Sequence, residues 1–144
     1  MSVSLWQAPL DRFQSEVAAA QPAPAGVAVA CVTATLGLSL LLKVLRITRK
    51  RDDLLDPASR LIEELRTAAD ADVAAVRAFM ETRDKQSLHD VPARAAHSIA
   101  QALTLCAAAS ESTSGLISAD VAAATALLEG AATAVNACVS ANRA

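Results

Sequence analysis

Apolar residues recur every three or four positions along most of this chain, which is the spacing of a helix that buries one face. The alternating pattern that is typical of β-strands is nearly absent. Prolines and polar runs divide the pattern into five helical segments, at residues 4–20, 26–49, 57–83, 91–109 and 118–142. We therefore predict an all-α fold, a single-domain bundle of about five helices that spans residues 1–144.

The second segment is apolar nearly all round, and it can be interpreted in two ways. About seventeen uncharged residues, 26–42, lie near the lower limit for a membrane span, and a basic cluster follows them. However, the run is rich in Ala, Thr, Gly and Ser, and the other helices are amphipathic, so they need an apolar partner inside the molecule. We expect a buried central helix in a cytoplasmic protein without a membrane partner, and a single membrane span is the alternative.

Prolines and polar residues set the expected helix ends. The Pro-rich run 22–24 ends the first segment, and Pro9 can move its start. Asp56 followed by Pro57 is a typical helix start, and residues 84–90 form a polar break before the fourth segment. One apolar stripe is expected on the first helix: Trp6, Leu10, Phe13 and Val17.

Composition changes this picture in three respects. Hydrophobic residues make up 53% of the chain, but Ala dominates them and aromatic residues are only 2%, so the core is thin and a homodimer is expected to bury further apolar surface. The net charge of −2 argues against nucleic acid as a partner. The three cysteines show no CxxC spacing and are expected to be buried free thiols in a reducing compartment, with no metal site: Cys31, Cys106 and Cys138.

Small residues on two helices allow a close crossing. Gly37 follows Ala30 and Ala34 at helical spacing, so the three residues share one face. Ala131 and Ala134, further along the chain, are also spaced to share a helix face. These faces can form a dimer seam with a ligand pocket beside it, or simply the core of one chain. Both interpretations stay open at this point.

The order of motifs along the chain resembles the cyclodeaminase/cyclohydrolase family. Members have Pro-x-Pro-Gly-Gly-Gly-Ser before an Ala-rich helix with a later Leu-Gly, and here Pro22-Ala-Pro-Ala-Gly-Val-Ala28 precedes Leu36-Gly37. The basic run Arg49-Lys50-Arg51 is similar to the Lys-Lys-Lys of the family. Further resemblances lie at Asp70 to Met80, at Val91-Pro92, at Ala119 to Glu129 and at Asn142.

This resemblance implies an all-helical folate enzyme, a formimino-tetrahydrofolate cyclodeaminase or a methenyl-tetrahydrofolate cyclohydrolase. Such chemistry needs no metal or redox cofactor, and a tetrahydrofolate derivative is the candidate substrate. The resemblance also implies that the turn at Gly26, Val27 and Ala28 contacts the ligand. The departures from the family pattern suggest a rewritten folate pocket: Ala25, Val27 and Ala28 in the turn, and Ala119, Ala122 and Cys138 near the end of the chain.

Two residues are candidates for proton transfer. Asp120, which follows the expected cap Ser118, matches an acidic position of the family and could act as acid/base, or it could serve only the helix dipole. His89 could be a general base or a plain loop residue. Asp70 and Asp72 lie two apart on a helix, and we expect them to be a solvated surface pair.

The candidate ligand-binding residues are Gly26, Val27, Ala28, Arg49, Lys50, Arg51 and Ala119. The three basic residues could hold anionic groups of a ligand, or they could form a solvated helix end. The favoured hypothesis is a small enzyme that adds water to a nitrogen heterocycle, or eliminates ammonia or water from it. Two alternatives keep the fold: an enzyme for a non-folate metabolite in specialised biosynthesis, and a non-catalytic helical dimer or scaffold protein.

Overall fold

Helices account for nearly all of the regular structure in the computed structural model, which describes residues 3–143. Five α-helices are present in this part of the chain, and no strand is found in it. Two short 3-10 turns, η1 (Leu5–Gln7) and η2 (Asp52–Leu54), accompany them. The α-helices are α1 (Leu10–Ala18), α2 (Gly26–Thr48), α3 (Leu55–Thr82), α4 (Gln86–Ser110) and α5 (Ile117–Asn142).

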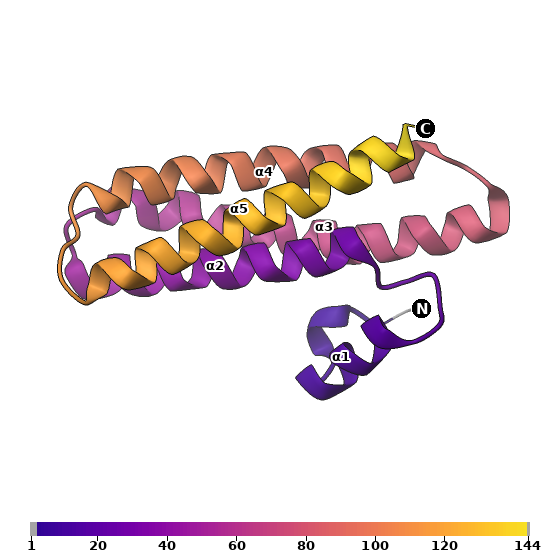
Figure 1. Ribbon diagram of the computed structural model, residues 1–144, viewed down its shortest axis with the longest axis horizontal. Helices are drawn as coiled ribbons and strands as arrows, with labels where there is room; N and C mark the ends of the chain where they lie inside the picture. The colour runs from indigo at the N-terminus through magenta and orange to yellow at the C-terminus, as the bar shows by residue number, and fades with distance from the viewer. Residues whose placement is uncertain (1–2, 144) are drawn as a thin grey trace.

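The four long helices form an antiparallel bundle in which α2, α3, α4 and α5 follow one another around the core (Figure 1). Helix α2 packs against α3 on one side and α5 on the other, and it faces α4 across the diagonal. Two side-chain contacts define how the helices align along the bundle. Lys43 of α2 forms an ion pair with Asp120 of α5, and the Ser98 hydroxyl of α4 donates a hydrogen bond to Glu64 of α3. The prediction of an all-α, single-domain bundle is confirmed.

Helix α2 is the central helix, as predicted from its apolar composition. Twelve of its residues are buried, and Leu38, Leu41 and Val44 are fully shielded by protein neighbours. Two helices of the described chain, Gly26–Thr48 and Leu116–Asn142, have the length and apolar composition that crossing a membrane would require. Helix α2 is mostly buried in the bundle, whereas only 28% of the apolar window of α5 is buried.

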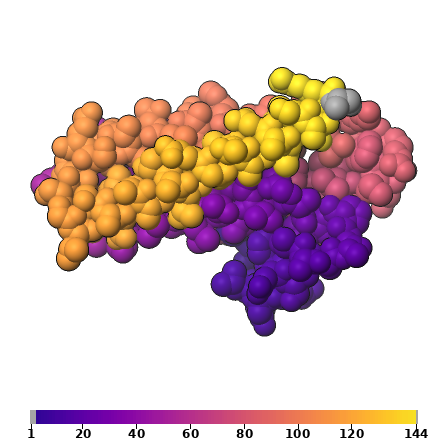
Figure 2. Space-filling view, viewed as in Figure 1, coloured from indigo at the N-terminus to yellow at the C-terminus, as the bar shows by residue number. Residues whose placement is uncertain are grey.

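The first helix differs from the prediction of one helix over residues 4–20. Pro9 separates the 3-10 turn η1 from α1, so the expected apolar stripe is broken. Trp6 leaves that stripe, because its indole Nε1 donates to the Arg66 carbonyl at 3.0 Å and its ring lies under the Arg66 guanidinium. No residue of α1 (10–18) is buried, and Leu10 is 79% exposed. Helix α1 therefore protrudes from the bundle as a separate lobe (Figure 2).

The fourth helix begins earlier than predicted, at Gln86 instead of Val91, and Pro92 lies inside it. The Asp84 carboxylate accepts a hydrogen bond from the Gln86 N–H and so supports the new start. Pro92 has no N–H to donate to the Leu88 carbonyl four residues earlier. The Asn142 side chain fills this position instead, because its Nδ2 donates to the Leu88 oxygen at 2.9 Å.

We expect Asn142→Ala to lower the free energy of unfolding by about 1 kcal/mol relative to Asn136→Ala, because only the first removes a hydrogen bond to a half-buried carbonyl. Asn136 is exposed on the same helix, so the two variants compare the loss of an asparagine with and without this hydrogen bond. Urea denaturation of the two variants measures the difference, and equal stabilities would contradict this role of Asn142.

Candidate functional site

The residues predicted to form the site lie at two opposite ends of the bundle. Gly26, Val27 and Ala28 form the first turn of α2, whereas Asp120 lies beside Lys43 near the other end of that helix. Lys43 lies seventeen positions after Gly26 on α2, which corresponds to about 26 Å of helix. One chain therefore does not bring Asp120 and the Gly26 turn together.

Asp120 lies in the first turn of α5, as predicted, and its Oδ2 is 2.6 Å from the Lys43 Nζ. The two side chains are 31% and 52% exposed, so this ion pair faces solvent. Ser118 does not cap the helix, because its hydroxyl donates back to the Gly115 carbonyl. Ala119 is exposed beside Asp120. The catalytic role of Asp120 stays a prediction.

The basic run after α2 is partly neutralised by its own neighbours. Arg49, at the left-handed end of the helix, pairs with Asp52 at 3.0 Å. The Arg51 guanidinium binds both oxygens of Asp53, and this contact raises the pKa of Arg51 and lowers the pKa of Asp53. Lys50 is exposed, and no ion pair of the described chain includes it. Lys50 is therefore the member of this run best placed to meet an anionic ligand.

A groove of about 570 Å³ lies beside the Gly26 turn, between α2 and α5. Its walls are small and largely apolar, and helix α1 contributes Val17 to its rim. The α2 and α5 residues along it are Gly26, Val29, Ala30, Thr33, Gly130, Ala131 and Ala134, and the turn adds Pro24 and Ala25. This groove is the position on the described chain where the predicted ligand turn meets a cavity.

Only one of the three predicted turn residues lines this groove. Gly26 is exposed there, but Val27 and Ala28 point into the bundle core and are 5% and 0% exposed. A Cβ atom on Gly26 would lie 2.9 Å from the Cys138 Sγ of α5. The glycine therefore leaves room for the Cys138 side chain beside the start of α2, and the departures at Ala25, Val27 and Cys138 meet at one end of the bundle.

Asp72 overturns the expectation of a solvated pair with Asp70. Its side chain is only 3% exposed and lies against the first turn of α2, where the Ala28 N–H hydrogen-bonds its carboxylate. The residue before this helix, Ala25, offers no side-chain cap, so Asp72 of α3 supplies the acceptor from another helix. Asp70 is also engaged, because its Oδ1 accepts the Leu5 N–H at 2.9 Å.

Burial dominates the electrostatics around Asp72. Desolvation raises the pKa of Asp72 to about 6, although the Ala28 N–H opposes the shift. Desolvation also raises the pKa of two neighbouring thiols, that of Cys31 to about 12 and that of Cys138, and the Asp72 charge adds to both shifts. A carboxylate with a pKa near 6 can exchange a proton near neutral pH, but Asp72 does not line the groove beside the Gly26 turn.

The spacing of apolar residues in the sequence already indicates that Asp72 is buried. The buried residues Leu61, Leu65 and Ala69 precede it at helical intervals, which places it on the same apolar stripe of α3. A charged residue on a buried stripe is a candidate for a capping or proton-transfer role.

His89 lies in the first turns of α4, at the same end of the bundle as the Gly26 turn, since the neighbouring Leu88 carbonyl contacts the end of α5. Its side chain is exposed, and it does not line the groove beside the Gly26 turn. Its role as a general base stays a prediction. Within residues 3–143, no group of three His, Cys, Asp or Glu side chains is arranged to hold a metal ion.

An apolar surface runs from the groove along the outside of the bundle, and we call it the α2/α5 face. Leu36 and Ile47 are 56% and 61% exposed on α2, and Leu127 is 38% exposed on α5. The other members are half-buried or exposed: Val29, Thr33 and Leu40 of α2, and Ala123, Gly130, Ala134 and Ala137 of α5. The buried Gly37 lies behind this face, where α2 and α5 cross within one chain.

One comparison with known proteins identifies a related family. The family model described as formiminotransferase-cyclodeaminase matches residues 9–87, which is just over half of the 144 residues. The match covers α1, the Gly26 turn, α2 and α3, and it ends before His89 and Asp120. No curated protein matches the chain.

Proposed function

Because the chain belongs to the formiminotransferase-cyclodeaminase family, we propose that it is a homodimeric enzyme acting on a nitrogen heterocycle. The reaction is the addition of water, or the elimination of ammonia or water, by acid/base catalysis. The observation that carries this proposal is the groove at the Gly26 turn, which is continuous with the unpartnered α2/α5 face. A second subunit on this face would close the groove.

Of the two-fold arrangements that would cover this face, one joins the two ends of the bundle. A two-fold axis in the plane of the α2/α5 face, crossing the helices near Leu36 and Leu127, pairs each α2 with its partner in opposite directions. The Lys43 end of one subunit then lies over the Gly26 end of the other. Such a dimer would bring together the predicted residues that one chain keeps apart: the Gly26 turn, and Asp120 with Lys50 of the partner subunit.

The proposed chemistry needs proton transfer and orientation only, so we propose no metal or redox cofactor. The Asp120 carboxylate would take a proton from the attacking water and return it to the leaving nitrogen, while Lys43, at 2.6 Å, holds its position. Lys50, with Arg49 and Arg51 beside it, would meet anionic groups of the substrate, as a folate-like ligand would require. Asp72 would remain behind the turn and support the start of α2.

A non-folate heterocycle is a second candidate substrate, and a specific observation favours it. Ala25 stands at the groove where the family resemblance implies glycine, and the thiol of Cys138 packs against Gly26 where an Asn is implied. The Cβ atom of Ala25 makes the groove narrower than glycine would, and the Cys138 thiol makes this end of the bundle less polar than an Asn would. Thermal-shift measurements with folates and with a panel of other heterocycles would separate the two substrates, and a scaffold protein would respond to neither.

We expect Asp120→Asn to lower the turnover of methenyl- or formimino-tetrahydrofolate, or of the heterocycle that binds, by at least roughly a hundredfold. Loss of the acid/base group removes proton transfer and leaves binding largely intact. Glu81→Gln, on an exposed position of α3, is the control and should keep normal turnover. Near-normal turnover of Asp120→Asn would remove Asp120 from the mechanism and return Asp72 and His89 as the groups to test.

A mixing experiment tests the shared site directly. Ala25→Trp would fill the groove, and Asp120→Asn would remove the acid/base group, so each dimer alone would be inactive. Random mixing of the two would give half heterodimers with one intact site each, and hence about a quarter of the normal activity. An inactive mixture, with dimers confirmed by sedimentation, would show that the groove and Asp120 do not act across subunits.

A further inference from the structure

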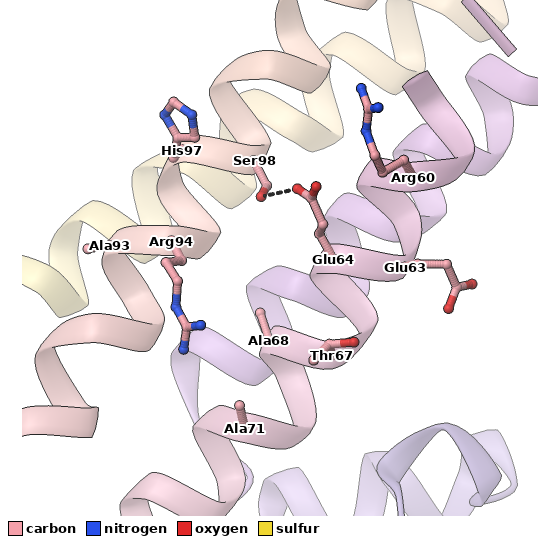
Figure 3. A pocket seen from close by; sticks show the side chains of 10 residues that line it. All are labelled: Arg60, Glu63, Glu64, Thr67, Ala68, Ala71, Ala93, Arg94, His97 and Ser98. Carbon is pink, nitrogen blue, oxygen red and sulfur yellow. Dashed lines mark hydrogen bonds between the residues drawn. The ribbon is translucent and has the colours of Figure 1, made fainter. Parts of the chain in front are cut away.

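A second groove lies on the opposite side of the bundle, between α3 and α4 (Figure 3). Its volume is about 660 Å³, which falls within the range of small-molecule sites. Helices α3 and α4 face away from the α2/α5 face, because α2 and α4 are diagonal neighbours in the bundle. This groove is therefore separate from the site of the proposed function.

Alanines make the floor of this groove apolar and leave room above it. Ala68 and Ala71 of α3 lie across from Ala93 of α4, and none of them carries a side chain beyond Cβ (Figure 3). The Ser98 hydroxyl of α4 donates to the Glu64 carboxylate of α3 at 3.0 Å and so crosses the groove as a bridge. The bridge divides the groove, and the alanine floor lies on one side of it.

The acidic side chains of the groove have polar partners within the chain, whereas its arginines form no ion pair among residues 3–143. Glu63 is 3.9 Å from Arg66, and Glu64 accepts the Ser98 hydroxyl. Among residues 3–143, no ion pair includes Arg60 or Arg94. The groove therefore offers two guanidinium groups that can bind an anion.

Arg94 is the better placed of the two arginines. It lies one helical turn before Ser98 on α4, and its side chain extends over the alanine floor toward the level of Ala71 (Figure 3). Arg60 lies on the other side of the bridge and points away from the floor. Because Ser98 is level with Glu64 in antiparallel helices, Arg94 is level with Ala68, about 12 Å along the axis from Arg60.

We propose that this groove binds an organic anion with a flat apolar body and a carboxylate at one end. The apolar body would lie on Ala68, Ala71 and Ala93, and the carboxylate would form a bidentate pair with Arg94. The Ser98–Glu64 bridge would limit the ligand on one side, and the Glu64 charge would keep the carboxylate end directed toward Arg94.

Titration of the full chain with 2-naphthoate tests this site, with 2-naphthamide as the neutral probe of the same shape. We expect the naphthoate to bind at least about tenfold more tightly, since a paired carboxylate contributes a charge-assisted hydrogen bond pair. Calorimetry measures the affinity, and NMR shifts of the Ala68, Ala71 and Ala93 methyl groups locate the ligand.

Three variants sharpen the result. Arg94→Gln should reduce naphthoate binding to the level of the amide, whereas Arg46→Gln, an exposed arginine of α2, should leave it unchanged. Glu64→Gln keeps an acceptor for Ser98 but removes a negative charge, so it should strengthen naphthoate binding severalfold. Arg94 is exposed, so unchanged unfolding midpoints will show that its replacement leaves the fold intact.

Equal binding of the two probes, or naphthoate binding that is insensitive to Arg94→Gln, would overturn the proposal. Shifts at Gly26 and Thr33 in place of the alanine methyl groups would do the same, because they would move the ligand to the other groove. Turnover does not enter this experiment, so its failure leaves the proposed enzyme function untouched.

Discussion

Replacing Gly37 by valine is expected to destabilise the fold by about 3 kcal/mol, at the upper end of the usual cost of overpacking a core. A Cβ atom at this position would lie 3.2 Å from the Ala124 carbonyl oxygen and 3.3 Å from the Leu128 side chain. The first neighbour is backbone of α5, so it cannot rotate away. The two methyl groups of valine would therefore push α5 from α2 along the most extensive contact of the bundle.

A second helical glycine provides a control position at which an added side chain meets no neighbour. A Cβ atom on Gly130 would meet nothing within 4 Å, so Gly130→Ala should stabilise the helix by up to about 1 kcal/mol through propensity alone. Urea unfolding of both variants is measured at a dilution that keeps the chains monomeric, since Gly130 also belongs to the α2/α5 face. A Gly37→Val protein as stable as the parent would contradict the close crossing of α2 and α5.

Replacing Asp72 by asparagine is expected to raise the free energy of unfolding at pH 7.5 by about 3 kcal/mol. Burial raises the pKa of Asp72 from 3.8 to about 6, so the folded state holds a proton that the unfolded chain has already lost between these values. Stability therefore falls as the pH rises through this window and then levels off above it. A shift of about two pKa units corresponds to about 3 kcal/mol.

The pH profile of this difference distinguishes the charge from the hydrogen bond. Asparagine carries no charge and still accepts the Ala28 N–H, so the stability gain of Asp72→Asn should vanish below about pH 4. Asp72→Ala also removes the charge but leaves the Ala28 N–H without its acceptor, so it should be less stable than Asp72→Asn by about 1–2 kcal/mol at every pH. A gain that does not change between pH 4 and 7.5 would show that burial does not shift the Asp72 pKa.

Local patterns were sufficient to predict the architecture. Helix α2 is apolar nearly all round, which favours a mostly buried position, and its observed bounds agree with the predicted ones within one residue. The Pro-rich run also ended the first helix near its predicted place. These features depend on neighbours a few residues apart, which periodicity and proline chemistry describe well.

Contacts between distant residues explain where the predictions failed. A proline is common in the first turn of a helix, so Pro92 was expected near the start of α4. Here it lies inside the helix, and Asn142 of α5 donates to the carbonyl that the proline leaves free. Asp72 was expected at the surface because two aspartates lie close together, yet only the packing of α3 against the start of α2 buries it. The position of Asp120 beside Lys43, far from Gly26, likewise depends on the register of α2 and α5.

The start of α2 has a consequence for synthesis of the chain. Every helix that shields α2 comes after it in the sequence, and the acceptor for its first turn comes from α3. During translation α2 therefore leaves the ribosome before α3, α4 and α5 have been made. Helix α5, which packs along the length of α2, is the last of the three. The nascent chain must therefore keep its most apolar segment from aggregating until α5 has been made.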